Sequence, residues 1–352
     1  MITMAKTNPI RIGIVGLGRA GWGMHGPELN GKESMFQIVA GCDLDADHRK
    51  RFANKYGCSV YRRIEDLIAD KDVELVDIAT RSTEHVSHAL LALKANKDVF
   101  IEKPMAVSYP EALTLKPAIR RSRGKVYIRH NRRFEPGYQH IREIMASKVL
   151  GEIYEIKLRR NGYSRRDDWQ TLIRCGGGQL LNWGPHIIDH ALRLLESPVA
   201  DMWSDLKLIS AVGDAEDHLH IILKGKNGRV VDLQISGGSA IPEPEYIVLG
   251  ARGGLRSSGN EIYLRYLDPQ NKLIRRRAKP GTPKQGFGSP DNLRWIEKTI
   301  PVEPKSGATM TSIWNHLYDS IRKGKPFPIT LDEALGVMQV VTAAKKGTPF
   351  AG

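Results

Sequence analysis

The sequence lacks the features that define several large classes of protein. It has only three cysteines, Cys42, Cys58 and Cys175, and no two of them form a C-x-x-C pair. A disulfide framework and a cysteine-based zinc site are therefore not expected. No stretch approaches the roughly 20 apolar residues that a membrane helix needs, and residues 1–9 lack the apolar core of a secretory signal. These absences predict a cytoplasmic protein with no membrane partner.

What is present is the composition of a globular protein. The chain has 352 residues, of which 41% are hydrophobic and 26% charged. That length corresponds to about two domains, and those proportions are ordinary for chains that build apolar cores. No internal repeat or low-complexity tract interrupts it.

Positive charge is in excess, with 53 Lys and Arg against 39 Asp and Glu, a net charge of +14. The basic residues gather at 157–166 and 272–279, and neither segment carries a nucleic-acid-binding motif. Solvated surface charge is the favoured interpretation, an anionic small-molecule substrate comes second, and nucleic acid is not an expected partner.

A glycine-rich turn follows the first apolar run of the chain. Residues 11–15 are typical of a buried strand, and the six residues after them read Gly16, Leu17, Gly18, Arg19, Ala20 and Gly21. In this G-x-G-x-x-G pattern the first glycine permits the tight turn, the second lets a pyrophosphate approach the backbone, and the third lets the helix pack on the strand. The pattern predicts a dinucleotide-binding loop at residues 16–21.

Asp43 fits the acidic residue that such a loop requires. It ends a second predicted strand, residues 36–42, and lies 22 residues after Gly21, close to the roughly 20 expected for a ribose-binding carboxylate. A carboxylate there accepts hydrogen bonds from the ribose hydroxyls and repels a 2′-phosphate, and Leu44 offers that phosphate no charge. NAD is therefore expected in preference to NADP. The alternative is that Asp43 caps a helix, a role for which Asp45 competes.

Strands and helices then alternate through the first part of the chain. Strands are predicted at 75–79, 99–101 and 126–128, with helices at 84–95 and 110–121. This order is typical of a doubly wound parallel sheet, a Rossmann α/β domain, whose ligands bind beyond the carboxyl ends of the strands.

Glu102, Lys103 and Pro104 stand at such an end. An ammonium there can hydrogen-bond a substrate hydroxyl or exchange a proton, and a cis Pro104 would aim it inward. The alternative is a surface ion pair.

In order along the chain, several motifs resemble those of the Gfo/Idh/MocA family of nicotinamide-dependent oxidoreductases. They are the turn at 16–21, Thr80 with His85, the E-K-P at 102–104, residues 131–136, and the three glycines 176–178 followed by His186 and Asp189. The resemblance extends from about residue 10 to residue 346. It implies a Rossmann domain followed by an α+β domain with a large, mostly antiparallel sheet, which often makes dimer or tetramer contacts.

The resemblance also implies roles for individual residues. Lys103 and His186 match the catalytic lysine and histidine, and Asp189 matches a substrate-contacting aspartate. The substrate would be a sugar, a polyol or a derivative. Two positions depart from the family pattern: Asn182 stands where many sugar dehydrogenases have Asp, and Arg81 stands where proline is usual. An uncharged Asn182 cannot stabilise an imidazolium, so the sequence leaves the strength of His186 as a proton acceptor open.

The cofactor-binding set expected from these motifs comprises Gly16, Leu17, Gly18, Arg19, Ala20, Gly21, Asp43, Thr80, His85, Glu102 and Lys103. Substrate contacts are expected from Asp189, Asn182, Tyr163, Trp169 and Arg165, because aromatic faces stack on sugars and arginines bind carboxylate or phosphate. For the segment 159–175 the alternative is a basic surface loop.

The second part of the chain has a different pattern. Helices are expected at 138–148, 185–196, 309–323 and 331–345, and strands at 152–158, 206–212, 217–223, 229–236 and 246–249. Turns between successive strands indicate an antiparallel meander, and residues 279–304 are expected to form a long loop. His186 with His190 and His218 with His220 have metal-compatible spacings but no carboxylate partner, so no metal is expected. The domains are predicted as 1–130 and 131–352, with the last helix free to pack back on the first.

Overall fold

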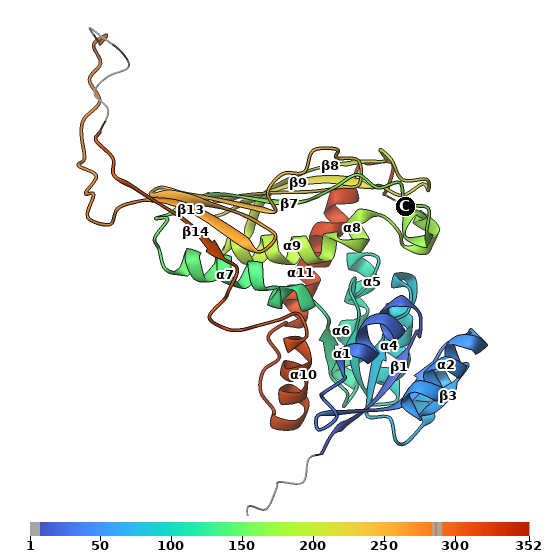
Figure 1. Ribbon diagram of the computed structural model, residues 1–352. Helices are drawn as coiled ribbons and strands as arrows, with labels where there is room; N and C mark the ends of the chain where they lie inside the picture. The colour runs from blue at the N-terminus through green and yellow to red at the C-terminus, as the bar shows by residue number, and fades with distance from the viewer. Residues whose placement is uncertain (1–7, 284–285, 287–290, 352) are drawn as a thin grey trace, which may run out of the picture.

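A six-stranded parallel sheet forms the first part of the molecule (Figure 1). The computed structural model of the whole chain describes residues 8–283, 286 and 291–351. The strand order is β3-β2-β1-β4-β5-β6. Ile14 of the central strand β1 is completely buried and Val15, on the opposite face, is buried as well, as expected for a strand covered on both faces. The strands are β1 (Ile10–Val15), β2 (Phe36–Cys42), β3 (Ser59–Tyr61), β4 (Leu75–Ile78), β5 (Asp98–Ile101) and β6 (Val126–Ile128). This confirms the predicted Rossmann-like α/β sheet.

Helices connect these parallel strands, as the alternating pattern predicted. They are α1 (Gly26–Glu28), α2 (Ala46–Tyr56), α3 (Ile64–Ala69), α4 (His85–Lys94), α5 (Tyr109–Leu113) and α6 (Leu115–Arg121). The single helix expected at 110–121 is thus divided in two at Thr114. A π-helix, Gly21–His25, precedes α1. Because all the strands are parallel, the loops after β1, β2, β4 and β5 lie at one edge of the sheet, where the ligand-binding residues were predicted.

An eight-stranded sheet dominates the second part, in the order β14-β13-β12-β11-β7-β10-β9-β8. Its strands are β7 (Ile153–Asn161), β8 (Val199–Lys207), β9 (His218–Gly225), β10 (Val230–Ser236), β11 (Tyr246–Gly250), β12 (Gly253–Ser258), β13 (Glu261–Leu267) and β14 (Trp295–Pro301). All neighbouring pairs are antiparallel except β7 with β10. The predicted large, mostly antiparallel sheet is confirmed.

Three details of this sheet differ from the prediction. It is not a simple meander, because β7 lies between β10 and β11. Strand β8 begins at Val199, seven residues before the expected strand. Residues 279–304 are not all loop, since β14 pairs with β13. Only Ile296 and Ile300 of this edge strand pack against the core, and its other residues are exposed, so its apolar pattern was too short to predict a strand.

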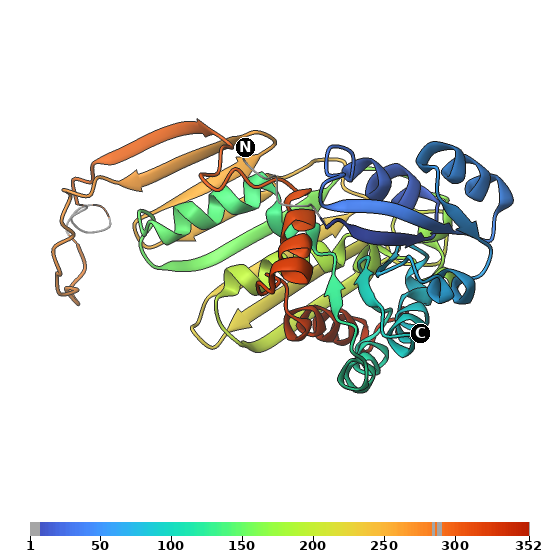
Figure 2. The same cartoon turned by 90° about the horizontal axis from the view of Figure 1, so that it is seen from below.

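Three helices cover one face of the large sheet: α7 (Pro136–Ala146), α9 (Gly184–Leu195) and α11 (Leu331–Lys345). The short helix α8 (Gln179–Asn182) leads into α9. Helix α10 (Ser312–Lys323) extends away from this layer and lies beside the first sheet (Figures 1 and 2). There its Trp314 is completely buried and packs edge-on against Phe36 and Phe100. Within the described residues, no helix has the length and apolar character to cross a membrane.

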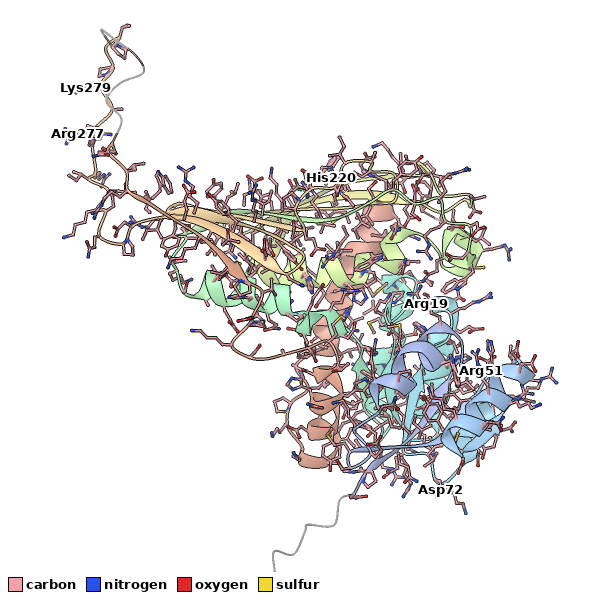
Figure 3. The ribbon with its side chains drawn as sticks, in the orientation of Figure 1. Arg19, Arg51, Asp72, His220, Arg277 and Lys279 are labelled. Carbon is pink, nitrogen blue, oxygen red and sulfur yellow. The ribbon has the colours of Figure 1, made fainter. Side chains whose placement is uncertain are left out.

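The two basic clusters have different environments. Lys272 to Lys279 are exposed on a segment that extends far from the body of the molecule, where Figure 3 labels Arg277 and Lys279. In the other cluster, Arg159 pairs with Asp232 and Glu243, and Arg160 pairs with Glu135 and Glu245. The second cluster is therefore mostly compensated by carboxylates, which argues against a general anion-binding role for it.

Candidate active site

The glycine-rich loop has the shape that a dinucleotide requires. Gly16 has φ +91°, and a Cβ there would lie 2.7 Å from the carbonyl oxygen of Ala79. A Cβ on Gly21 would lie 2.1 Å from the carbonyl oxygen of Gly16, so the helix packs too closely for any side chain. No atom lies within 4 Å of a Cβ built on Gly18, which leaves its backbone open to an approaching pyrophosphate. The three glycines thus fit the three roles predicted for them.

Asp43 is held against this loop at the end of β2. One carboxylate oxygen accepts the backbone N–H of Leu17 at 2.7 Å, and the other accepts the N–H of Asp45 at 2.9 Å. The helix cap is Asp45, whose side chain accepts from the N–H groups of Asp47 and His48. Asp43 is therefore not the cap of α2. Its Oδ2 also lies 3.2 Å from Nδ1 of His48, and a contact of Asp43 with a ribose stays a prediction.

His85 joins two loops at the same edge of the sheet. Its ring is buried, with Nδ1 2.6 Å from the carbonyl oxygen of Pro104 and Nε2 3.1 Å from that of Thr80. The Thr80 hydroxyl lies 3.2 Å from Nδ1 of His88. These contacts fix the loop after β4 relative to the loop after β5. The contact with the Thr80 carbonyl accounts for the pairing of His85 with Thr80 in the motif. A direct contact of His85 with the cofactor stays a prediction.

Lys103 follows β5 and reaches across to the second domain. Its Nζ donates to the backbone carbonyl of Asn182, at the end of α8, at 2.9 Å. Burial lowers the pKa of Lys103; Glu102 opposes that effect, and the charges of Arg19, Arg129 and Arg132 add to it. The Lys103–Pro104 peptide is cis, as expected. A lysine with a lowered pKa suits proton exchange as well as hydrogen bonding to an alcohol.

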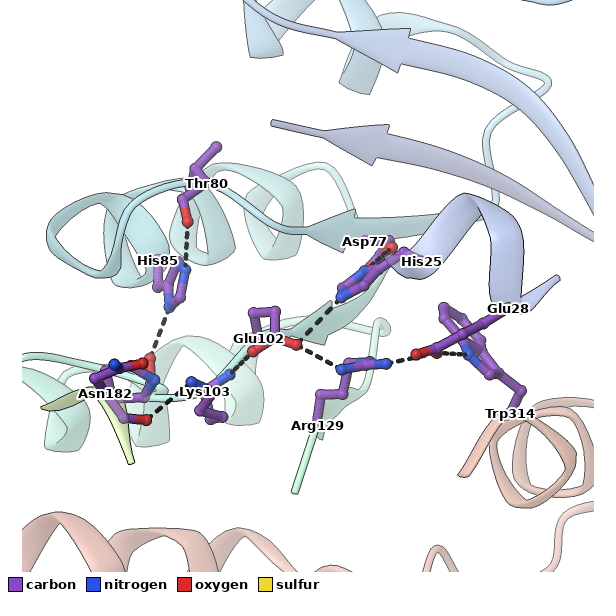
Figure 4. A network of polar contacts seen from close by, with 11 residues as sticks. His25, Glu28, Asp77, Thr80, His85, Glu102, Lys103, Arg129, Asn182 and Trp314 are labelled. Atoms are coloured by element: carbon purple, nitrogen blue, oxygen red, sulfur yellow. Dashed lines mark hydrogen bonds and ion pairs between the residues drawn. The ribbon is translucent and has the colours of Figure 1, made fainter. Parts of the chain in front are cut away.

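Glu102 is not a surface partner of Lys103, contrary to the alternative considered above. Its carboxylate is buried, and one oxygen lies 2.6 Å from Arg129 and 3.2 Å from Nε2 of His25 (Figure 4). Its other oxygen accepts the backbone N–H of Lys103 at 2.8 Å. Burial opposes its ionisation, but Arg129 and His25 hold the pKa of Glu102 well below its usual range. Glu102 is therefore an anion that anchors the Lys103 backbone.

His186 lies buried in the first turn of α9. Burial, followed by the charges of Lys103 and Arg132, holds its pKa well below the usual value, so the ring is neutral at physiological pH. Its buried Nδ1 has no hydrogen-bond partner within the described part of the chain. The Asn182 side chain instead accepts from Gln170 at 3.3 Å. A neutral imidazole with a free buried nitrogen can accept a proton or a hydrogen bond from a substrate.

Asp189 has a different set of contacts from those expected of a substrate ligand. Its two oxygens accept from Nε and Nη2 of Arg133 at 2.9 and 2.5 Å, and the pair is buried. Arg133 also binds Glu333 at the start of α11. Asp189 and the neighbouring His190 are both buried. These contacts favour a structural role for Asp189, and the substrate contact remains an untested prediction.

The loop that follows β7 is only partly at the site. Trp169 lies under the guanidinium of Arg81, which is 5.7 Å from its ring centre, so the loop meets the residues after β4. Tyr163 is exposed and pairs with Gly238 at the end of the large sheet, and Arg165 is exposed too.

Among the described residues no cluster of three His, Cys, Asp or Glu could hold a metal ion, and His220 binds Asp232.

Sequence reasoning missed His25, Arg129 and Arg132. His25 and Arg129 contact Glu102 from the first helix and from the end of β6. The guanidinium of Arg132 lies 4.3 Å from the ring centre of Trp183, and its charge lowers the pKa values of Lys103 and His186. A charged residue directly after a buried strand was the available signal for Arg129, as it was for Lys103.

Two family models match the chain in the same order as the two sheets. Residues 10–130 match the model described as an oxidoreductase family with an NAD-binding Rossmann fold, and residues 138–256 match the GFO/IDH/MocA C-terminal domain. The chain belongs to the Gfo/Idh/MocA oxidoreductase family. This confirms the resemblance drawn from the motifs.

Individual members of the family are similar over most of the chain. A scyllo-inositol 2-dehydrogenase (NADP(+)) of Bacillus subtilis is 25% identical, over 99% of this chain and 97% of that protein. A 2,7-anhydro-N-acetylneuraminate hydratase of Escherichia coli is 24% identical, over 69% of this chain and 67% of that protein. The crystal structure of an NAD-binding protein from Listeria innocua superimposes with a TM-score of 0.82 and 23% identity, over 97% of both chains, which shows the shared fold.

Proposed function

We propose that this member of the family transfers hydride between a nicotinamide dinucleotide and a secondary alcohol of a sugar, polyol or related compound. The observation that carries the proposal is the convergence of Lys103 and the segment that bears His186 at the edge of the parallel sheet where the glycine-rich loop lies. The scyllo-inositol dehydrogenase, which matches nearly the whole chain, supports a polyol-like substrate.

In this proposal each residue has a separate role at the reacting alcohol. The bound nicotinamide supplies the hydride acceptor or donor. Lys103 hydrogen-bonds the reacting oxygen and stabilises developing negative charge on it. His186, neutral and with an unpartnered nitrogen, accepts the proton of that hydroxyl when the alcohol is oxidised, and Asn182 lines the site between them. Trp169 and Arg81 border the substrate on the cofactor side.

The test is the change in reduced-nicotinamide absorbance with NAD or NADP over a panel of inositols, sugars, polyols, amino sugars and uronates. Turnover on one class of alcohol would establish the reaction and name the substrate class. Reduction of a C=C or C=N bond, with no alcohol turned over, would contradict the proposal.

For the cofactor we propose NAD in preference to NADP, although the inositol dehydrogenase relative bears NADP(+) in its name. We expect Asp43→Asn combined with Leu44→Arg to shift the ratio of NADPH to NADH affinity toward NADPH by about 100-fold, because a repelling charge is replaced by an attracting one. Fluorescence titration of both reduced cofactors measures the ratio.

Asp45→Asn is the matched control for the cofactor variant. It changes a neighbouring carboxylate that caps α2, so it costs about 1 kcal/mol of stability at most and leaves the cofactor ratio alone. Wild-type protein that binds NADPH as tightly as NADH would show that Asp43 does not select the cofactor.

A second candidate is a redox-neutral reaction, in which a retained cofactor oxidises a sugar carbon transiently and then reduces it again. The relative named as a hydratase favours this alternative. Dinucleotide that remains bound in stoichiometric amount after purification, with no net turnover on the panel, would support it. The same result with no reaction of any kind would favour a non-catalytic dinucleotide-binding regulator.

We also propose that the protein forms a homodimer or homotetramer through the outer face of the large sheet. The three helices cover only the inner face. The outer face exposes Trp203, which is 53% exposed, and Tyr154, which is 52% exposed. Large aromatic side chains on an uncovered sheet face are typical of an interface between subunits.

A further inference from the structure

We propose that His25 is a positioning residue for the reaction. As an imidazolium held between Asp77 and Glu102, it keeps Glu102 turned toward the Lys103 backbone and fixes the field in which the Lys103 ammonium gains or loses its proton. This inference rests on the proposed role of Lys103 in the reaction.

The local fold directs His25 inward. It is the last residue of the π-helix Gly21–His25, which lies within the first helix, between the helical residues Arg19 and Ala20 and helix α1. Gly26 follows it, and a Cβ there would lie 2.2 Å from the hydroxyl of Tyr56, so the wide turn packs directly on α2. The side chain of His25 is completely buried beneath the parallel sheet. Single π-helical turns are rare and often occur at functional sites.

Both ring nitrogens of His25 face carboxylates. Nδ1 lies 2.7 Å from Oδ2 of Asp77, and Nε2 lies 3.2 Å from Oε1 of Glu102 (Figure 4). A neutral imidazole has one N–H, so only the doubly protonated ring can donate to both. Burial acts to lower its pKa, but the charge of Asp77 and the hydrogen bonds to Asp77 and Glu102 raise the pKa of His25 to about 9.

The remaining groups around His25 complete a buried charge network. Arg129, after β6, donates to Glu102 at 2.6 Å and to Glu28 at 2.5 Å, and its charge opposes protonation of His25. From α10 the group facing His25 is the uncharged ring of Trp314, edge-on at 5.9 Å, and its Nε1 donates to Glu28. Three carboxylates and two cations thus alternate from Asp77 to Glu28, and every carboxylate has a cationic partner.

This network reaches Lys103 through Glu102. Oε2 of Glu102 accepts the Lys103 backbone N–H, whereas Oε1 is held by His25 and Arg129. The Glu102 charge raises the pKa of Lys103 and nearby cations lower it. Removing the His25 cation should therefore raise the pKa of Lys103, and removing the Glu102 anion should lower it. A network without electrostatic influence on Lys103 would leave its pKa unchanged in both variants.

The test measures the titration of Lys103 without any substrate. Wild type, His25→Gln, Glu102→Gln and His140→Gln are labelled with trace acetic anhydride between about pH 6 and pH 11, and acetylation of the Lys103 peptide is followed by mass spectrometry. We expect the labelling midpoint of His25→Gln to rise by about 0.5–1 pH unit and that of Glu102→Gln to fall by a similar amount. The control, His140, accepts a hydrogen bond from the Glu303 backbone N–H, outside this network, so its variant should titrate like wild type.

Midpoints that stay fixed, or that move in the same direction in both variants, would overturn the inference. Should His25→Gln fail to fold, nitrogen-15 NMR of the wild-type histidines decides instead. Two protonated ring nitrogens on His25 at about pH 7.5 would support the inference, and a neutral tautomer would overturn it. Neither measurement needs turnover, so the influence of His25 on Lys103 is tested separately from the proposed function.

Discussion

Replacement of Lys103 by alanine is expected to lower turnover by at least about 10²–10⁴-fold, the usual loss when a positioned acid or base is removed. The lysine stands where the loop after β5 meets the end of α8, and its Nζ is fixed by the Asn182 carbonyl. No other lysine or arginine side chain donates to that carbonyl among the described residues, so its ammonium has no ready substitute. Steady-state kcat and KM on the alcohol identified by the panel measure the loss.

The distribution of the loss identifies the role of Lys103. An effect confined to kcat, with the NADH dissociation constant unchanged, indicates that the lysine acts on the reacting oxygen. Lys103→Arg keeps the charge but cannot release a proton at accessible pH, so an equal loss in this variant indicates proton exchange. Lys116→Ala, which breaks an exposed ion pair with Asp332, is the matched control. Turnover of Lys103→Ala within tenfold of wild type would refute the assignment.

The Asp189→Asn substitution is expected to destabilise the folded protein by about 3–5 kcal/mol, because it breaks a buried ion pair and leaves Arg133 partly unpaired. Arg133 bridges Asp189 on α9 to Glu333 on α11, where Glu333 also completes the capping box of that helix. Chemical unfolding measures the change. A substrate-binding Asp189 would instead show a raised KM at nearly wild-type stability.

The pH dependence gives a second check on this pair. Burial opposes ionisation of Asp189, but its neighbours, His130 and Arg133 first among them, lower its pKa below the ordinary value of 3.8. A carboxylate with a lowered folded-state pKa contributes its stability above the unfolded pKa and loses it as the pH falls through the folded one. The difference between wild type and Asp189→Asn should therefore be full at neutral pH and shrink below about pH 4. A difference independent of pH would point to packing rather than charge.

Local motifs predicted the shape of the glycine-rich loop and the place of Lys103 after β5, for a physical reason. The roles of Gly16, Gly18 and Gly21 depend on backbone shape within six residues, and the position of Lys103 depends on where one strand ends. Such features are written into short stretches of sequence. The sequence left the cap of α2 open between Asp43 and Asp45, and the structure assigns it to Asp45.

The polar interior of the site could not be predicted in this way. Asp189 lies on the polar side of an amphipathic helix and looks solvated, because its partner Arg133 is 56 residues earlier and Glu333 is 200 residues from Arg133. His25 and Glu102 are likewise 77 residues apart. Whether such a charged residue is buried and paired depends on partners that only the folded chain brings near. The edge strand β14 was not predicted for a related reason: it is recognised by its pairing with β13, which the sequence alone does not show.

Helix α10 has a consequence for the order in which the molecule can be made. Trp314 completes the buried surroundings of Glu28 from 286 residues away, and Arg322 binds the backbone of Pro9 across 313 residues. As the chain leaves the ribosome, the dinucleotide-binding half emerges first but cannot gain its last partners until nearly all of the remainder has been translated. The first half is thus compact in the folded protein, but residues translated near the end of the chain complete it. Its final assembly must therefore follow synthesis of the second half.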